Sequence, residues 1–258
     1  MRVLIAGAGV IGTVYGADLA GAWHAVSVLS HPPRTEDVAR NGLIAHDVPE
    51  GSRTDARVSV APDAAGTLFD LVLVAVRSDQ LAAACSQLTG LAGSPAVVFF
   101  GTTRGGPAIS GQVHGDVMLG FPGVGGVMRD GTAEYVRIPQ QPTALQAGTD
   151  TRLDQLARAL GTRGFAVQRV ADMDGWLAYH AASVACVVAA LYRCGTAWRP
   201  TARPSGSCAQ PSPRLLRSHE SNAAKSRSPW RLSRGTGQTR NHAGCRTSGA
   251  SYDGEGHT

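Results

Sequence analysis

Three glycines near the start of the chain have the spacing of a phosphate-binding turn. The segment Gly7-Ala8-Gly9-Val10-Ile11-Gly12 reads G-x-G-x-x-G between a short apolar run and a helical pattern. In such a turn the first glycine permits the tight bend, the second lets the backbone approach a pyrophosphate, and the third lets the helix pack on the strand. The N–H groups at the helix start favour negative charge. We therefore predict a dinucleotide site. The alternative, in a chain with 32 glycines, is a turn without a ligand.

The residues after the second predicted strand, 25–29, indicate which dinucleotide is bound. NAD-binding domains tend to carry an acidic side chain there for the ribose 2′-hydroxyl. This chain has Ser30 instead, with Arg34 shortly after it. A guanidinium can hold a 2′-phosphate with paired hydrogen bonds, whereas a carboxylate would repel it. The sequence thus favours NADP(H) over NAD(H). The alternative is that Arg34 is an ordinary solvated side chain of a loop.

Apolar runs and turns alternate along the chain as in βαβ units, which predicts an α/β fold with a Rossmann-type, mostly parallel sheet. Buried strands are expected at 3–6, 25–29, 70–76, 96–100, 117–120 and 166–170, and helices at 10–20, at about 79–88 with Ser78 or Asp79 as the cap, and at 151–160. Segments 42–46 and 56–60 are expected to form a hairpin, and 134–139 and 143–147 antiparallel edge strands. Because ligands bind beyond the carboxyl ends of parallel strands, we expect loops 7–12, 30–34, 101–106 and 120–126 to meet at one cleft.

A long helix is predicted from Asp172 or Asp174 to about Cys194. Its residues 181–192 are apolar nearly all round, which predicts burial on every side. If they were exposed, they would favour self-association.

The remaining composition indicates a protein of the reducing cytoplasm. The five cysteines are odd in number and lack C-x-x-C spacing, so neither a disulfide framework nor a metal site is expected. No leader is visible at the N-terminus. No apolar run reaches the roughly 18 residues of a membrane span, so no membrane association is expected.

Residues 196–258 differ sharply in composition from the rest. They carry ten Ser, seven Gly, five Pro and ten basic residues and a net charge of +7, whereas residues 1–195 carry 14 Arg against 16 acidic residues. With so few large aliphatic residues, 196–258 is predicted to be a disordered tail. A basic disordered segment could bind nucleic acid. Its aromatic residues Trp198, Trp230 and Tyr252 are isolated, however, so we expect no such binding.

Several motifs in residues 1–195 form a recognisable combination. They are GAGVIG followed by Tyr15-Gly16 and Leu19-Ala20, the segment 21–26 that leads into the second strand, DLVLVAVRSDQ at 70–80, and the run that begins at Trp176. This combination resembles the ketopantoate reductase family (2-dehydropantoate 2-reductases). The resemblance implies NADPH-dependent reduction of a 2-keto acid, as in pantothenate biosynthesis. It also implies a cofactor-binding Rossmann domain, 1–172, and a helical domain that begins with 173–195 and helps to bind the substrate.

The chain departs from this family's pattern where the resemblance would place catalysis. The family's W-x-K lysine falls on Ala178, which cannot donate a proton, and residues 1–195 contain no lysine. The family's asparagines further along the helix fall on Ala182 and Cys186. The rest of the helical domain should follow Gly195, where the polar tail stands instead. One hypothesis is that a reading frame was lost near Thr196.

Two functions remain open. The chain is an NADPH-dependent 2-keto acid reductase of impaired activity, or it is a non-catalytic NADP(H)-binding remnant without the lysine and most of the substrate domain. The candidate proton donors are Thr102, Tyr179 and His180, although His180 lies about 200° round the helix from Ala178. The expected cofactor-binding residues are Gly7, Ala8, Gly9, Val10, Ile11, Gly12, Ser30, Arg34, Arg77, Gly101 and Thr102. Among them, Arg77 stands where the family has a lysine after the fourth strand, and Gly101-Thr102 stands where it has Asn-Gly.

Overall fold

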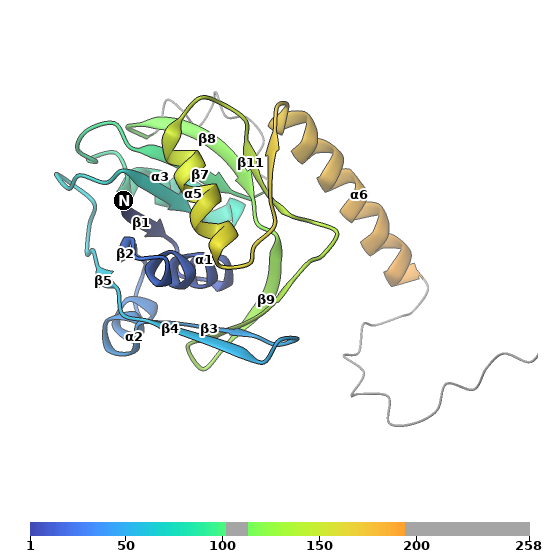
Figure 1. The fold of residues 1–258 in the computed structure, drawn as a ribbon, viewed down its shortest axis with the longest axis horizontal. Helices are drawn as coiled ribbons and strands as arrows, with labels where there is room; N and C mark the ends of the chain where they lie inside the picture. Colours follow the sequence, from blue (N-terminus) through green and yellow to red (C-terminus); the bar gives the residue numbers. More distant parts are fainter. Residues whose placement is uncertain (102–112, 194–258) are drawn as a thin grey trace, which may run out of the picture. The chain divides into compact units, whose positions relative to one another are not determined.

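The structure is a computed structural model that describes residues 1–101 and 113–193. An eight-stranded, mostly parallel sheet forms the centre of this part of the chain (Figure 1). The strand order is β12-β11-β8-β7-β6-β1-β2-β5. These strands are β1 (Arg2–Ala6), β2 (Ala25–Leu29), β5 (Ser59–Val60), β6 (Leu71–Val74), β7 (Ala96–Phe100), β8 (Asp116–Phe121), β11 (Thr143–Gln146) and β12 (Val167–Val170). Strand β11 runs antiparallel to β8, and the other pairs are parallel. The predicted Rossmann-type α/β fold is confirmed.

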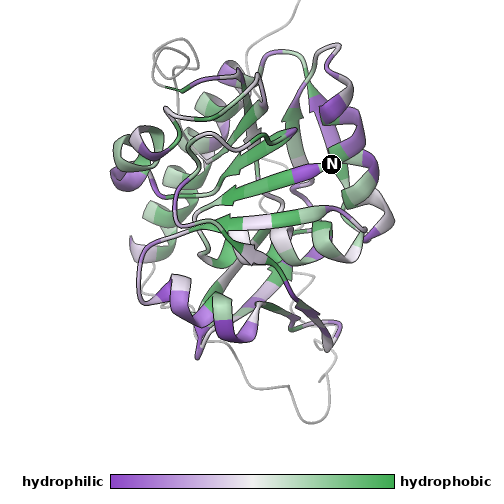
Figure 2. Cartoon of the chain, turned by 90° about the vertical axis from the view of Figure 1, so that its left-hand side faces the viewer, coloured by the Kyte–Doolittle hydropathy of each residue, from purple (hydrophilic) through white to green (hydrophobic). Residues whose placement is uncertain are grey.

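Helices cover both faces of this sheet, which explains why its central strands are apolar on both sides (Figure 2). Helices α1 (Val10–Gly21) and α5 (Thr151–Thr162) pack on one face, where Val3 and Ile5 of β1 point. Helix α3 (Leu81–Gln87) and the first turns of α6 (Met173–Arg193) pack on the other face, where Leu4 and Ala6 point. The strands and helices therefore enclose two separate cores.

A second, four-stranded sheet packs beside α1 in the order β4-β3-β10-β9. Its strands are β3 (Leu43–Asp47), β4 (Ser52–Ala56), β9 (Val124–Arg129) and β10 (Thr132–Arg137). A hairpin is present as β3 and β4, but its second strand was predicted at the wrong place: β4 shares only Ala56 with the predicted segment 56–60. Residues Ser59–Val60 leave the hairpin and pair with β2 instead.

Two predictions about the segment 120–147 are wrong. Segments 134–139 and 143–147 were expected to pair, yet β10 lies in the small sheet and β11 in the large one. Segment 120–126 was expected to be a loop, yet β9 begins at Val124. The glycines there permit close strand packing, because a Cβ at Gly126 would lie 2.2 Å from the carbonyl oxygen of Glu134.

Two helix starts also differ from the sequence analysis. Neither Ser78 nor Asp79 caps α3: residues 78–80 form a 3₁₀ turn, η1 (Ser78–Gln80), and Asp79 pairs with Arg77 instead. Helix α2 (Arg34–Asn41) was not predicted at all. It is short and polar and buries only Val38, so its sequence holds too few apolar residues to mark a helix.

Helix α6 begins as predicted, since the Asp172 carboxylate accepts a hydrogen bond of 2.9 Å from the Gly175 N–H. Its expected burial is wrong for the described residues: only Met173 and Leu177 are buried. The first turns rest on β8, and past them no described element covers the helix. By length and composition α6 could cross a membrane, a test that core helices also pass. The predicted tail, 196–258, lies outside the described residues, and the domain boundaries at 172 and 195 remain predictions.

Candidate functional site

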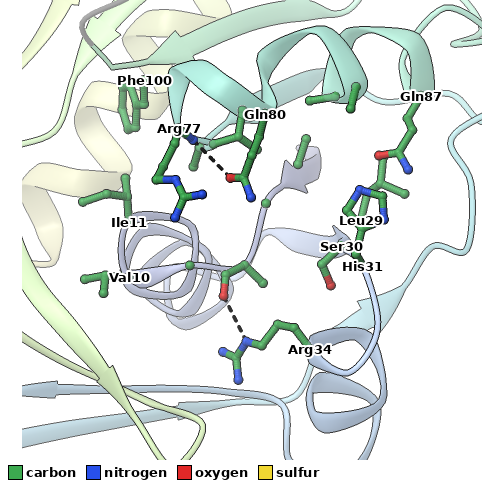
Figure 3. A pocket seen from close by; sticks show the side chains of 18 of the residues that line it. Val10, Ile11, Leu29, Ser30, His31, Arg34, Arg77, Gln80, Gln87 and Phe100 are labelled. Carbon is green, nitrogen blue, oxygen red and sulfur yellow. Dashed lines mark hydrogen bonds between the residues drawn. The ribbon is translucent and has the colours of Figure 1, made fainter.

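A cleft of about 820 Å³ opens at the carboxyl ends of β1, β2, β6 and β7 (Figure 3). Its size suits an extended small-molecule ligand. Its position beyond the carboxyl ends of parallel strands is where ligands bind in doubly wound folds. The lining residues come from the glycine turn, the end of β2, the segment after β6, and α3: Ala6, Gly7, Ala8, Gly9, Val10, Ile11, Leu29, Ser30, His31, Arg34, Ala75, Val76, Arg77, Asp79, Gln80, Ala83, Ala84, Gln87, Phe100 and Met128.

The three glycines of the turn have different surroundings. Gly7 has φ +97°, which L side chains rarely adopt, and its N–H donates to the Leu29 carbonyl at 2.9 Å. A Cβ at Gly12 would lie 1.9 Å from the Gly7 carbonyl oxygen, so only glycine lets α1 pack against the turn. A Cβ at Gly9 would meet nothing within 4 Å. Gly9 is therefore required for neither conformation nor packing, and the open space beside it faces the cleft.

The start of α1 supplies the donors that a phosphate needs. Gly9 occupies the N-cap position, and no side chain caps the helix there. The N–H groups of a helix's first turn have no intrahelical acceptor, and the helix dipole favours an anion beside them. With the open space beside Gly9, these amides fit the pyrophosphate of a dinucleotide.

Arg34 lies at the same end of the cleft, with its guanidinium pointing at the glycine turn (Figure 3). Nε donates to the Ala8 carbonyl at 2.9 Å and Nη2 to the Thr13 hydroxyl at 2.9 Å. Nη1 donates to the Gly131 carbonyl at 3.0 Å and to the Asp37 carboxylate. The side chain is 18% exposed. Arg34 is thus not the solvated loop residue that the sequence left open. Four intramolecular bonds use all but one of its five N–H donors.

Arg77 and Gln80 line the opposite wall of the cleft. The exposed Arg77 guanidinium forms a paired contact with Asp79, Nε to Oδ1 at 3.0 Å and Nη2 to Oδ2 at 2.9 Å. This pairing raises the pKa of Arg77 and lowers that of Asp79. The Gln80 side chain accepts from the Arg77 N–H at 3.4 Å. A positive charge therefore stands at this wall, partly neutralised by its neighbour.

The structure brings most of the expected cofactor-binding residues together. Those that line the cleft are Gly7, Ala8, Gly9, Val10, Ile11, Ser30, Arg34 and Arg77. Gly12 packs beneath the turn, and Gly101 is described but is not among the lining residues. Thr102 and the rest of loop 101–106 lie outside the described residues. Segment 120–126 does not reach the cleft; Met128 of β9 lines it instead.

Sequence reasoning did not single out several lining residues. His31, Gln87 and Met128 carry no motif of their own, and β9 had been expected to be a loop. A signal for Gln80 and Gln87 was available, because both lie on the helical segment that follows a predicted buried strand.

No lining residue comes from α6. The ring of His180 stacks on Trp176, with centroids 5.0 Å apart, and lies 4.3 Å from the ring of Phe121 on β8. Burial lowers the pKa of His180. Tyr179 is 77% exposed, and Ala178 is half-buried. The structure therefore does not bring Tyr179 or His180 to the cleft wall. Among the described residues no group of three His, Cys, Asp or Glu side chains could hold a metal ion.

Comparison with known proteins gives one family match. Residues 3–102 match the family model described as ketopantoate reductase PanE/ApbA. No curated protein matches the chain.

Solved structures with the same fold cover about two thirds of the chain. A PanE/ApbA family ketopantoate reductase from Ralstonia eutropha JMP134 is 23% identical, with a TM-score of 0.57 over 69% of this chain and 59% of that one. A 2-dehydropantoate 2-reductase from Methylococcus capsulatus is 22% identical, with a TM-score of 0.56 over 67% and 58%. D-mandelate dehydrogenase, with NADH and anilino(oxo)acetate, is 16% identical, with a TM-score of 0.55 over 67% and 57%. The chain thus spans about three fifths of the length of these proteins.

Proposed function

Because residues 3–102 form a ketopantoate reductase domain, we propose that this chain binds NADP(H) and is an oxidoreductase of the 2-dehydropantoate 2-reductase type with impaired activity. The observation that carries the proposal is the cleft itself. Its glycine turn leaves open space beside Gly9, and the uncapped start of α1 borders that space. A dinucleotide would place its pyrophosphate there.

We expect impaired activity because the reduction of a ketone requires a proton donor. The bound cofactor supplies a hydride, and the developing alkoxide must receive a proton or strong hydrogen bond. Ala178 cannot give one, and neither Tyr179 nor His180 lines the cleft; the remaining candidate donor, Thr102, lies outside the described residues. Loss of a general acid typically slows a reaction about 100- to 10,000-fold. This chain's residues hold and orient the cofactor, while proton delivery is the defective step.

The second candidate is a non-catalytic NADP(H)-binding protein. The absence of any α6 residue from the cleft lining favours it. Binding and turnover discriminate the two candidates. NADPH binding is measured by fluorescence titration, and NADPH oxidation is followed with 2-dehydropantoate as the substrate. Saturable binding with slow, enzyme-dependent oxidation supports the impaired reductase. Saturable binding without oxidation above the blank favours the second candidate. Failure to bind NADPH contradicts both.

The proposed preference for NADP(H) rests on the cleft end formed by Ser30, His31 and Arg34. None of these three side chains is acidic, and the Ser30 hydroxyl bonds to Thr35 at 3.1 Å. A 2′-phosphate can therefore approach Arg34 without meeting a carboxylate from the β2 end. The dissociation constants of NADPH and NADH test this preference, and tighter binding of NADH would contradict it.

We further place the activity in pantothenate biosynthesis in the cytoplasm. The support is the family of residues 3–102 together with Cys85 and Cys186, which are free thiols. Free thiols suit a reducing compartment. Fractionation of the native organism would contradict this if the protein appeared outside the soluble cytoplasmic fraction.

We also propose that two copies associate through α6. Leu177 and His180 of α6 rest on β8. Val184 and Val187 follow them along the same side of the helix, at alternating steps of three and four residues, and both valines are exposed. This is the spacing of a helix pair. No Asp, Glu, Lys or Arg lies between Asp174 and Arg193, so two copies can approach without repulsion. The exposed residues 181–192 span only about 18 Å, short of a bilayer's ~30 Å, which favours a protein partner.

Sedimentation velocity over a range of concentrations tests this association. We expect a concentration-dependent dimer for the unaltered chain and a monomer for Val187→Glu. The control is Ala189→Glu, which adds the same charge on another side of α6 and should leave the dimer intact. A monomer at every concentration for the unaltered chain would refute the proposal.

A further inference from the structure

Asp37 forms an ion pair with Arg34, the guanidinium that lines the cleft beside the end of β2. It lies one turn after Arg34 on α2, and its carboxylate oxygen Oδ2 pairs with Arg34 Nη1. Its other oxygen accepts a hydrogen bond of 2.7 Å from Asn41 Nδ2. The side chains of Arg34 and Asp37 are 18% and 28% exposed, so water screens this pair only partly.

Asp37 is one of four groups that accept hydrogen bonds from the Arg34 guanidinium. Three uncharged acceptors hold it from other directions: the carbonyls of Ala8 and Gly131 and the hydroxyl of Thr13, at 2.9 to 3.0 Å. They come from the glycine turn, the start of α1, and the turn between β9 and β10. Removal of the carboxylate charge would therefore leave Arg34 in place with a full positive charge.

We propose that Asp37 is a specificity-determining residue that acts through Arg34, weakening the chain's discrimination in favour of NADP(H) over NAD(H). This inference rests on the proposed function, because it requires a dinucleotide in the cleft. The two cofactors differ only at the ribose 2′ position, which carries a phosphate in one and a hydroxyl in the other. A phosphate near Arg34 feels the charge of the guanidinium and of its partner, whereas the uncharged hydroxyl feels little of either.

The inference explains why the sequence after β2 is ambiguous. An acidic side chain at the strand end would mark an NAD site. Here the acidic residue, Asp37, lies one turn into α2 instead, and it acts on the ribose 2′ position through its ion pair with Arg34. The chain thus carries a phosphate-binding group and the group that weakens it side by side.

The test compares Asp37→Asn with the unaltered full chain in fluorescence titrations of NADPH and NADH. Asparagine keeps the shape and can still accept from Asn41, but it removes the charge. We expect NADPH to bind about tenfold more tightly and NADH to change less than twofold, a shift that corresponds to about 1.4 kcal/mol. The gain should shrink as salt rises, because the interaction is one of charges near the surface.

Glu36→Gln is the matched control. It removes an acidic charge from the same turn of α2, but its exposed side chain points to solvent rather than to Arg34, so neither affinity should change. Asp37→Ser is a second charge-removing variant, used if Asp37→Asn loses its native circular dichroism. It should shift the NADPH-to-NADH ratio in the same direction.

The results of these titrations test the role of Asp37 and the proposed dinucleotide binding separately. An unchanged NADPH-to-NADH ratio, or equal weakening of both cofactors, would overturn the specificity role of Asp37 and leave dinucleotide binding standing. Weaker NADPH binding alone would also overturn it, since Asp37 would then hold Arg34 in its binding position. Failure of the unaltered chain to bind either cofactor would overturn the proposed function and this inference together.

Discussion

Gly9 and Gly12 belong to the same motif but have different roles. A side chain at Gly12 would collide with the Gly7 carbonyl, whereas a side chain at Gly9 would enter only the open space of the cleft. Gly12 therefore stabilises the fold, and Gly9 keeps room for a ligand.

Gly9→Val should weaken NADPH binding at least about tenfold, or ~1.4 kcal/mol, while the melting temperature stays close to that of the unaltered protein. The reason is that a Cβ at Gly9 meets no protein atom within 4 Å, so the larger side chain extends into the space where we propose that the pyrophosphate binds. Fluorescence titration and thermal unfolding measure the two quantities. Gly161→Ala is the control, because a Cβ there also meets nothing within 4 Å but lies on α5, away from the cleft. A Gly9→Val protein that binds NADPH as well as the parent would refute the phosphate-binding role of the turn.

For individual residues, the sequence predicted where a functional residue lies in the fold better than it predicted which residues that residue contacts. The spacing of the glycines was enough to locate the turn, because that chemistry is local. The surroundings of Arg34 were not predictable, since Gly131 is distant in the sequence and Asp37 belongs to a helix with no apolar pattern. Tertiary packing alone brings them to one guanidinium.

Helix α5 illustrates how a sequence signal sets an element boundary. Asp150 occupies its N-cap position, where the carboxylate accepts from the Arg152 N–H at 2.8 Å and from the Arg152 guanidinium. The hydrogen bonds from the Arg152 side chain lower the pKa of Asp150. The ionised carboxylate thus stabilises the start of α5, which covers one face of the large sheet.

Asp150→Ala should lower the free energy of unfolding by about 1 kcal/mol at neutral pH. Because the folded pKa of Asp150 lies below its unfolded value, this contribution is full above the unfolded pKa and is lost as pH falls through the folded pKa. The difference between the two proteins should therefore shrink on acidification. Urea unfolding at several pH values measures it. Asp154→Ala, which removes a half-exposed carboxylate from the same helix, should cost less. A difference that grows as pH falls would contradict this account of Asp150.

Ala178→Lys should not by itself restore rapid reduction of 2-dehydropantoate. Although the substitution supplies the lysine that the resemblance to ketopantoate reductases would place there, no residue of α6 lines the cleft in this structure. Steady-state NADPH oxidation by this variant, with Ala182→Lys as a control on the same helix, checks the expectation. A rate increase of about 100-fold or more for Ala178→Lys alone would show that the missing lysine, rather than the geometry of α6, is the main defect.

Elements with continuous apolar runs were the most predictable. Strands β1, β6 and β7 are buried on both faces, so every residue in them except the exposed Arg2 contributes to the apolar signal. Strand β9 escaped prediction because its glycines serve close packing, and α6 was expected to be buried because composition cannot show whether a covering element exists.

At the scale of the whole molecule, all of the described residues that line the cleft lie between Ala6 and Met128. The two hydrophobic cores draw on the large sheet, the small sheet and the helices up to the first turns of α6. Cofactor binding therefore depends on the part of the chain that matches the ketopantoate reductase model and on the small sheet beside it.

Removal of residues 196–258 should leave the NADPH affinity unchanged within about twofold, because every described lining residue of the cleft lies between Ala6 and Met128. It should also leave RNA retention on a filter unchanged, since the segment lacks spaced aromatic residues for stacking. Titration and filter binding of the full and shortened chains measure these quantities. Loss of RNA retention in the shortened chain would assign the basic segment a nucleic-acid role.

The central claim is that this chain has a working dinucleotide site whose chemistry is impaired. Isothermal titration calorimetry of the purified full chain with NADPH tests it most directly. We expect one saturable site per chain, with binding abolished or strongly weakened by Gly9→Val. No saturable heat for the unaltered, folded protein, or equal binding by Gly9→Val, would contradict it.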